Sequence, residues 1–224
     1  MINIISATKF SEAEFWEKSA LGLSLARLRF DVRINPRITY ENKLGLPSIY
    51  NAQIVASGSD DILVFVHDDI WLDDFFLAER VTEGLKAFDV IGIVGNRRRV
   101  AKQPTWIFVD MSFKYDDDVN LSGAVGLAQT SSGPVRYFGP APASCELMDG
   151  IFFAASRRTL VKNSVFFDPR FDFHFYDLDF CRTAKLRGLQ LGTWPISLTH
   201  QSNGLYGTEH WRNMHQIYIE KWGD

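Results

Sequence analysis

The first feature that suggests chemistry is a tripeptide of one imidazole and two carboxylates, His67-Asp68-Asp69. It directly follows residues 62–66, an apolar run typical of a central parallel strand covered on both faces. In open α/β sheets, ligands bind beyond the carboxyl ends of the strands. Imidazole and carboxylate together suit a divalent cation. The alternative is that one of the two aspartates only caps the following turn.

A second group of acids and histidines lies further along the chain. His174, Asp177 and Asp179 stand among phenylalanines at the start of a predicted helix. A carboxylate held among aromatic rings has its pKa raised by desolvation and could serve as a general base. One of these acids could instead be a helix N-cap. His200 ends a later strand, and a single histidine there is more often structural than a ligand.

These residues need a scaffold, and strand and helix signals alternate through residues 1–95. Strands are expected at 2–7, 30–35, 61–66 and 90–94. One helix begins after Ser11, which forms a capping-box pattern with Glu14. Further helices are expected from Pro47 to Gly58 and over 73–87. This order predicts an α/β fold with a doubly wound, mostly parallel sheet.

The pattern changes after Gly95. Residues 96–145 predict a long irregular region, which in compact domains is usually functional. Later elements are strands at 106–109, 151–155 and 189–196 and helices at 177–186 and 208–222. Without a linker or an internal repeat, we expect one domain over 1–224, with a smaller antiparallel or irregular part in its second half.

Composition excludes several classes of protein. The 24 basic and 27 acidic residues exclude binding of nucleic acid by charge alone. The hydrophobic share of 46% excludes disorder. Two cysteines cannot build a disulfide framework, and no apolar run approaches the roughly 20 residues that span a bilayer. The start of the chain lacks the pattern of a signal peptide, so a cytoplasmic protein is expected.

Several motifs occur together in one order. The run Ile62–Asp69 (ILVFVHDD) is followed by Asp149-Gly-Ile-Phe-Phe-Ala154, by Phe167-Asp-Pro-Arg-Phe171 and by Tyr176-Asp177-Leu-Asp179, before His200. Over residues 1–204 this order resembles the family-2 type of nucleotide-diphospho-sugar glycosyltransferases, which have the GT-A fold. In that family a D-x-D or related motif follows a hydrophobic strand, and His67 and Asp69 correspond to its two acids.

The resemblance implies metal-dependent, inverting transfer of a sugar to an acceptor hydroxyl. Asp69 would bind Mn²⁺ or Mg²⁺, His200 would be a further ligand, and Asp177 would be the general base. The implied acceptor-side residues are Asp149, Asp179 and Trp106. The implied nucleotide-side residues are Thr8, Asn35, Asn51, His67 and Asp68. Residues 1–95 would then hold the nucleotide and residues 96–224 the acceptor.

The resemblance also implies the partners. The donor would be a nucleotide sugar, with UDP the expected nucleotide, and the acceptor a glycan or lipid-linked glycan in polysaccharide biosynthesis. Peripheral membrane contact stays open. The chain departs from the family at Asn35-Pro36, where D-D-G-S commonly holds the nucleoside, and at Tyr176, where glutamate is usual. The Q-x-x-R-W motif of processive synthases is absent, which favours a single transfer.

Two alternatives remain. A nucleotidyltransferase would share the sheet and the acids but needs a Gly-rich loop after the first strand, and residues 7–12 contain no glycine. An inactive domain could bind a sugar or a partner protein, although both Asp69 and Asp177 are present. The triplet Arg97-Arg98-Arg99 could bind phosphate or simply form a solvated turn.

Overall fold

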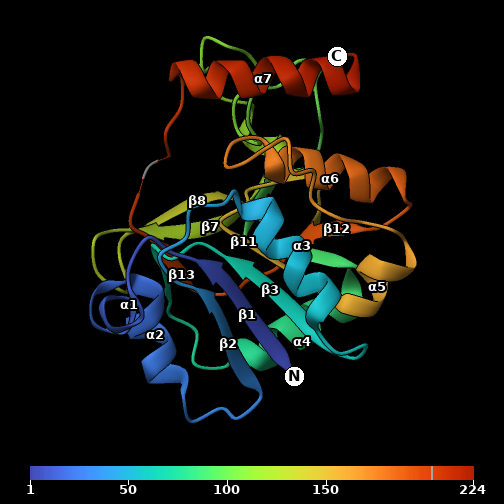
Figure 1. The fold of residues 1–224 in the computed structure, drawn as a ribbon. Coiled ribbons are helices and arrows are strands. Elements are labelled where there is room, and N and C mark those ends of the chain that lie inside the picture. The colour runs from blue at the N-terminus through green and yellow to red at the C-terminus, as the bar shows by residue number, and fades with distance from the viewer. Residues whose placement is uncertain (203) are drawn as a thin grey trace.

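The computed structural model describes residues 1–202 and 204–224. Its chain forms a mixed α/β structure with two sheets (Figure 1). The helices are α1 (Glu12–Lys18), α2 (Ala20–Leu28), α3 (Leu46–Ala56), α4 (Leu77–Ala87), α5 (Arg157–Lys162), α6 (Tyr176–Leu186) and α7 (Glu209–Trp222), with a 3₁₀ turn at Asp118–Asn120.

The larger sheet has the order β2-β1-β3-β11-β5-β12-β9. Its strands are β1 (Ile2–Ala7), β2 (Ile34–Thr39), β3 (Ile62–Val66), β5 (Val90–Gly92), β9 (Ala143–Ser144), β11 (Phe152–Ser156) and β12 (Leu191–Thr193). Strands β1, β2, β3, β5 and β12 run in one direction, whereas β11 and β9 are antiparallel to their neighbours. The predicted fold class, a mostly parallel sheet with helices on both faces, is confirmed.

The second sheet has the order β10-β6-β7-β13-β4, and β8 pairs with β7. Its strands are β4 (Ile70–Leu72), β6 (Val94–Asn96), β7 (Leu121–Leu127), β8 (Val135–Gly139), β10 (Leu147–Met148) and β13 (Leu198–His200). Both sheets therefore combine strands from the first and second halves of the chain. One cluster of buried apolar side chains spans both sheets.

Aromatic stacking fixes the helices on the larger sheet. Phe65 on β3 packs against Tyr50 of α3 at a centroid distance of 4.9 Å and against Phe167 at 5.1 Å. Phe167 stacks on Phe180 of α6 at 4.3 Å. Helices α3 and α6 thus share one face, while α4 packs on the other through the contact of Gly84 with Ile91. Of the 31 aromatic residues, 15 are buried, where they remove large areas from water.

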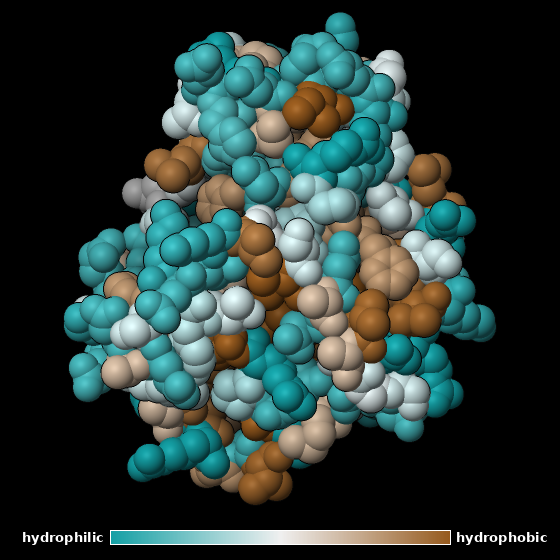
Figure 2. Space-filling view, viewed as in Figure 1, coloured by the Kyte–Doolittle hydropathy of each residue, from teal (hydrophilic) through white to brown (hydrophobic). Residues whose placement is uncertain are grey.

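Helix α7 lies at the end of the molecule opposite the N-terminus, where its outward face is mostly hydrophilic (Figures 1 and 2). Its inner face buries Trp211, His215 and Tyr218. Thr208 caps it by accepting a hydrogen bond from the amide of Trp211. The tail helix expected at 208–222 is therefore present.

The second strand, expected at residues 30–35, is wrong over residues 30–33. Phe30 and Val32 are 63% and 84% exposed, because they belong to a turn after α2 rather than to a strand. Asp31 holds that turn: its carboxylate accepts from the amide of Arg33, and its carbonyl accepts from the amide of Ile34. The strand begins only at Ile34 and ends at Thr39.

Other expected boundaries also move. The single helix after Ser11 breaks at Ser19, whose extended backbone ends α1 and whose hydroxyl caps α2 at the amide of Gly22. Helix 73–87 begins later, at Leu77. The strand at 90–94 divides at Ile93 between the two sheets. The region 96–145 is irregular only in part, since it contains β7 and β8. The strand expected at 106–109 is only an isolated bridge at Phe108.

Candidate active site

The candidate site forms where the chain passes from one sheet to the other. Residues 67–69 connect β3 of the larger sheet to β4 of the second sheet, and residues 149–151 connect β10 to β11 in the reverse sense. The antiparallel pairing of β3 with β11 brings these two connections together, because the amide of His67 donates to the carbonyl of Ile151 at 3.3 Å. The connections lie at the carboxyl edge of β1, β2 and β3, where α/β proteins bind ligands.

Strand pairing also brings His200 to the site. Strand β13 pairs antiparallel with β4 so that His200 lies opposite Ile70. The amide of Gln201 then donates to the carbonyl of Asp69 at 3.1 Å. A residue 131 positions later in the chain is thus held beside the tripeptide by strand pairing.

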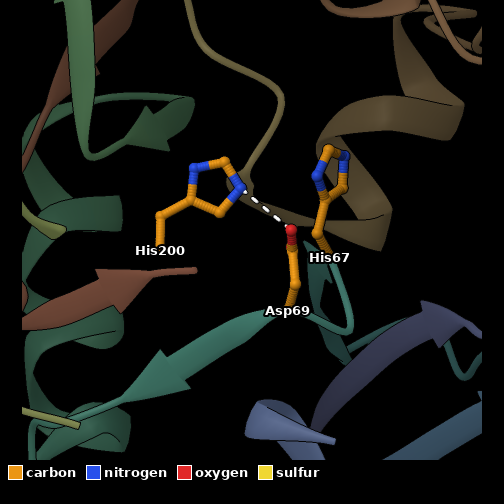
Figure 3. Close-up of side chains that lie close together, drawn as sticks. All are labelled: His67, Asp69 and His200. Atoms are coloured by element: carbon orange, nitrogen blue, oxygen red, sulfur yellow. Dashed lines mark ion pairs between the residues drawn. The ribbon is translucent and has the colours of Figure 1, made fainter. Parts of the chain in front are cut away.

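His67, Asp69 and His200 point toward one another (Figure 3). Each offers one ligand atom, and these atoms lie within 4.8 Å of one another. Asp69 Oδ2 lies 3.2 Å from His200 Nε2, whereas Asp69 Oδ1 is buried without a hydrogen-bond partner. An orphaned carboxylate oxygen between two imidazoles suits a borderline divalent cation, so the residues present fit a metal such as Mn²⁺.

Charges in this triad stabilise one another. Burial raises the pKa of Asp69, but the hydrogen bond and charge of His200 outweigh it and lower that pKa to about 2. For His200, burial lowers the pKa, but the Asp69 carboxylate more than compensates and raises it. Burial lowers the pKa of His67, which favours the neutral imidazole that ligates metals.

Tyr176 orients the His67 ring. Its hydroxyl donates to the carbonyl of Gly150 at 2.8 Å and lies 2.7 Å from His67 Nε2. Because the single hydroxyl proton is given to the carbonyl, His67 Nε2 carries a proton and donates to the hydroxyl oxygen. The lone pair of Nδ1 is then left for a ligand. Gly150 permits this approach, since a Cβ there would lie 2.3 Å from the tyrosine oxygen.

Asp177 stands at the first turn of α6, next to Tyr176. Phe175, which precedes the helix, has a left-handed backbone (φ 64°) that a buried aromatic residue rarely adopts. Asp177 Oδ2 accepts from the amide of Gly150 at 3.2 Å. Burial, together with the charge of Asp149, raises the pKa of Asp177 to about 7. A carboxyl poised near neutral pH is suited to move a proton.

Asp149 lies beside this acid and has its own fixed partners. Its Oδ2 accepts from Trp106 Nε1 at 2.5 Å, and its Oδ1 accepts from the amide of Ile151 at 3.1 Å. Trp106 is 5% exposed. The indole therefore holds the Asp149 carboxylate in place and forms part of the wall around it.

All of these groups open into one cavity of about 670 Å³. Seven of the residues singled out in the sequence line it: His67, Asp69, Trp106, Asp149, His174, Asp177 and His200. Tyr176, which was noted in the sequence only as a departure from glutamate, lines it as well. Its position directly before Asp177 was the one feature of the sequence that could have indicated a role, because the hydrogen bonds of its hydroxyl join residues that are distant in the chain.

Five predicted residues lie outside the cavity lining, and two of them, Asn51 and Asp179, have partners far away in the chain. Asn51 donates to the carbonyl of Phe167 at 2.7 Å and accepts from its amide at 2.9 Å. Asp179 is fully buried on α6, where it pairs with Lys221 of α7 at 2.6 Å and accepts from Trp222 Nε1 at 2.9 Å. Both side chains tie distant segments of the chain together.

Asn35 lies at the opposite edge of the sheet from the cavity. The sequence predicts Asn35 at the end of the second strand, but it lies near the start of β2, because that strand runs to Thr39. Its amide donates to Asn3 Oδ1 at 2.7 Å. The residue at the carboxyl edge is instead Thr39, whose carbonyl accepts from the amide of Thr8 at 2.9 Å.

Thr8 and Asp68 lie next to each other at this carboxyl edge, outside the cavity lining. Thr8 is buried, and its hydroxyl bonds to the Asp68 carboxylate. Burial raises the pKa of Asp68, and that hydrogen bond opposes the rise. Two arginines of the triplet at 97–99 already form ion pairs, Arg98 with Asp116 and Arg99 with Asp224.

No protein-family model and no curated protein sequence matches this chain. Its structure is similar to that of the GT-A glycosyltransferase GalNAc-T7 solved with UDP, GalNAc and Mn²⁺. The TM-score is 0.52 at 12% sequence identity, over 96% of this chain and 41% of the other. This chain thus spans about two fifths of that protein's length, and the likeness shows a GT-A type of fold. In the described part of the chain, no helix has the length and apolar character to cross a membrane.

Proposed function

We propose that the protein is a metal-dependent glycosyltransferase that moves a sugar from a nucleotide diphosphate to an acceptor hydroxyl with inversion. The observation that carries this proposal is the pairing of two unlike groups in one cavity. A triad fit for a cation lies beside a carboxyl whose pKa is about 7. A bound cation would stabilise the leaving group, and the carboxyl would remove the proton of the acceptor.

The triad His67, Asp69 and His200 would hold Mn²⁺ or Mg²⁺. When bound, such a cation neutralises the charge that develops on a departing diphosphate. Asp69 supplies the buried free oxygen, and His67 supplies the Nδ1 lone pair that Tyr176 leaves available. The GT-A fold and the UDP and Mn²⁺ of the similar structure support this assignment.

Asp177 would act as the general base. Its carboxylate removes the proton of the acceptor hydroxyl while the oxygen forms a bond to the anomeric carbon. The bond from that carbon to the diphosphate oxygen breaks, and its electron pair leaves with the diphosphate. Asp149 and Trp106 would border the acceptor, because they line the cavity next to Asp177.

The nucleoside would lie at the carboxyl edge near Thr8 and Asp68, with UDP as the proposed nucleotide. Asn35 and Asn51 have no part in this proposal, since their side chains are bonded elsewhere. Asp179 likewise serves to join α6 to α7. In this scheme residues 1–95 supply most of the donor side, and residues 96–224 supply the base and the acceptor side.

Calorimetric titration of UDP, GDP and dTDP, each with and without Mn²⁺, tests the proposal. We expect UDP to bind with Mn²⁺ and to bind at least tenfold more weakly in EDTA. Absence of binding to every nucleotide in both conditions would contradict it. Binding of a nucleoside triphosphate and sugar phosphate in preference to the diphosphate would favour a nucleotidyltransferase. UDP binding without turnover of any UDP-sugar would favour the inactive binding domain.

A further inference from the structure

The cavity also contains a basic group that the proposed chemistry does not use. Arg136 lies on β8, where side chains alternate between the two faces of the second sheet. Arg136 and Phe138 line the catalytic cavity, whereas Val135 and Tyr137 line a separate cavity on the reverse face. Among the described residues that line the catalytic cavity, Arg136 is the one lysine or arginine.

Two aromatic rings hold the Arg136 side chain. Its Cζ lies 5.2 Å from the ring centroid of Tyr115 and 4.9 Å from that of Phe138. Within the described chain, no carboxylate lies within 4.0 Å of this guanidinium, whereas Arg98, Arg99 and Arg182 each pair with an aspartate. A guanidinium that stacks on rings keeps its N–H donors free in the ring plane. This geometry favours an anion as the missing partner.

A continuous apolar wall joins Arg136 to the proposed base. Phe138 packs edge-on against Trp106 at 5.0 Å, and Trp106 donates to Asp149 beside Asp177. Phe108 extends this wall, at 4.9 Å from Tyr115 and 5.5 Å from Tyr206.

The wall offers few groups to a sugar. Apart from the Asp149 carboxylate, the described side chains of the wall include no carboxylate and no amide; they are Pro104, Thr105, Trp106, Ile107, Phe108, Tyr115, Val125, Leu127, Phe138, Leu205 and Tyr206. The Thr105 hydroxyl is already bonded to the amides of Ile107 and Phe108. A sugar ring carries a hydroxyl on most carbons, and burying these without partners is costly. The wall therefore suits an apolar body.

Strand register gives the span between the two polar ends. Arg136 is paired with Val125 on β7, and Leu127 on the same strand is paired with His200. Two strand spacings and two residues along the strand separate the Cα atoms of Arg136 and His200 by roughly 12 Å. An acceptor of one or two rings or an equivalent chain fits between the metal triad and the guanidinium.

We propose that the acceptor is amphiphilic, with a hydroxyl beside Asp177, an apolar body on the aromatic wall and a carboxylate or phosphate on Arg136. This inference rests on the proposed function, because only a transferase has an acceptor substrate. The anion site itself is tested separately.

Three probes distinguish the chemistry: 3-(4-hydroxyphenyl)propanoate, its methyl ester, and phenyl phosphate. Calorimetry is carried out on the full chain in EDTA, so that no probe can reach a metal at the triad. We expect the acid to bind about tenfold more tightly than the ester, a ratio set by one charge-assisted contact. Whichever anion binds more tightly identifies carboxylate or phosphate as the recognised group.

The variant Arg136→Gln should remove the preference for the acid and leave ester affinity within twofold. Arg136→Lys should keep part of the preference. The control is Arg187→Gln, an exposed arginine outside the cavity lining, which should change neither affinity. Equal binding of acid and ester, no binding of any probe, or equal effects of Arg136→Gln and Arg187→Gln would overturn the proposal. A parallel titration of UDP in the presence of Mn²⁺ separates failure of this inference from failure of the proposed function, because Arg136→Gln should leave the affinity for UDP unchanged.

Discussion

Two aspartates in the same cavity show how surroundings divide one residue type into two roles. Asp69 and Asp177 are both half-buried, and burial alone raises the pKa of each. Yet the pKa of Asp69 falls to about 2, while that of Asp177 rises to about 7. Asp69 faces the imidazoles of His200 and His67, whereas Asp177 faces the carboxylate of Asp149. One acid is thus a permanent anion, and the other can exchange a proton near neutral pH.

The largest expected effect comes from Asp177→Asn. The amide keeps the size and can still accept from Gly150, but it cannot take a proton from the acceptor. With the donor sugar identified by nucleotide screening, we expect the rate of transfer to fall about 10³-fold, within the range for general-base catalysis. Mn²⁺-dependent UDP affinity, measured by calorimetry, should stay within twofold of wild type. Equal loss of binding and transfer would show that the two aspartates do not have separate roles.

The next largest effect is expected for Asp69→Asn. Losing the central anion of the triad should weaken Mn²⁺-dependent UDP binding about 100-fold, because the amide oxygen is a poorer ligand and no longer balances the imidazoles. UDP binding in EDTA should change little. Asp60→Asn is the matched control, since Asp60 is exposed and pairs with Arg158 away from the cavity. Similar losses in both variants would indicate a general charge effect.

The contrast also predicts opposite effects on stability. Because the pKa of Asp177 is higher in the folded chain than in the unfolded chain, the folded state holds this proton more strongly. The contribution of this carboxyl to stability is fully present below about pH 4 and is lost as pH rises to about 7. Asp177→Asn should therefore be more stable than wild type by about 4 kcal/mol at pH 8, and within about 1 kcal/mol of it at pH 4.

Urea unfolding in EDTA at pH 4, 6 and 8 measures this difference. Asp69→Asn should behave in the reverse sense, since the folded pKa of Asp69 is lowered and its anion stabilises the native state at neutral pH. Parallel pH curves for wild type and Asp177→Asn would contradict the raised pKa.

The strands that carry the triad could be predicted because their signals are local. Residues 62–66 are continuously apolar and end abruptly at His67, and the acids at 177 and 179 mark the start of α6. These signals depend on side chains only a few residues apart. They pointed to His67, Asp69 and Asp177, whereas Asp149 and Trp106 were expected only from the resemblance to a family, and all five line the cavity.

The errors came from contacts between distant residues. The apolar run 90–94 looks like one strand, and only pairing with β11 and β7 divides it at Ile93. Asn51 and Asp179 find their partners 116 and 43 residues away, which no local pattern reveals. Alternation at residues 30–34 fits a strand as well as a turn, and the Asp31 hydrogen bonds decide for the turn. A smaller antiparallel part was expected in the second half of the chain, but the contribution of β4 and β6 to that sheet was missed for the same reason.

The smallest expected effect concerns Tyr176, which links the metal triad to the proposed base. Its hydroxyl bonds to His67, and its neighbour in sequence is Asp177. In Tyr176→Phe the ring remains, but nothing holds the proton on His67 Nε2, so the Nδ1 lone pair is available for only part of the time. Outer partners of metal ligands are worth 10–100-fold in affinity. Because Asp69 and His200 are untouched, we expect the lower value, about tenfold weaker Mn²⁺ binding, measured by competition with a chelating dye.

The matched control for this variant is Tyr137→Phe, because Tyr137 is exposed on the reverse face of β8 and contacts no residue of the triad. A ¹⁵N spectrum of the histidines gives an independent readout: Tyr176→Phe should shift the His67 ring nitrogens toward a mixture of tautomers, while those of His200 stay unchanged. A merely structural role for Tyr176 would instead lower the unfolding midpoint and leave the tautomer of His67 as it is. If metal affinity and tautomer both stay at wild-type values, the hydrogen bond does not prepare His67 for a cation, and the triad depends on Asp69 and His200 alone.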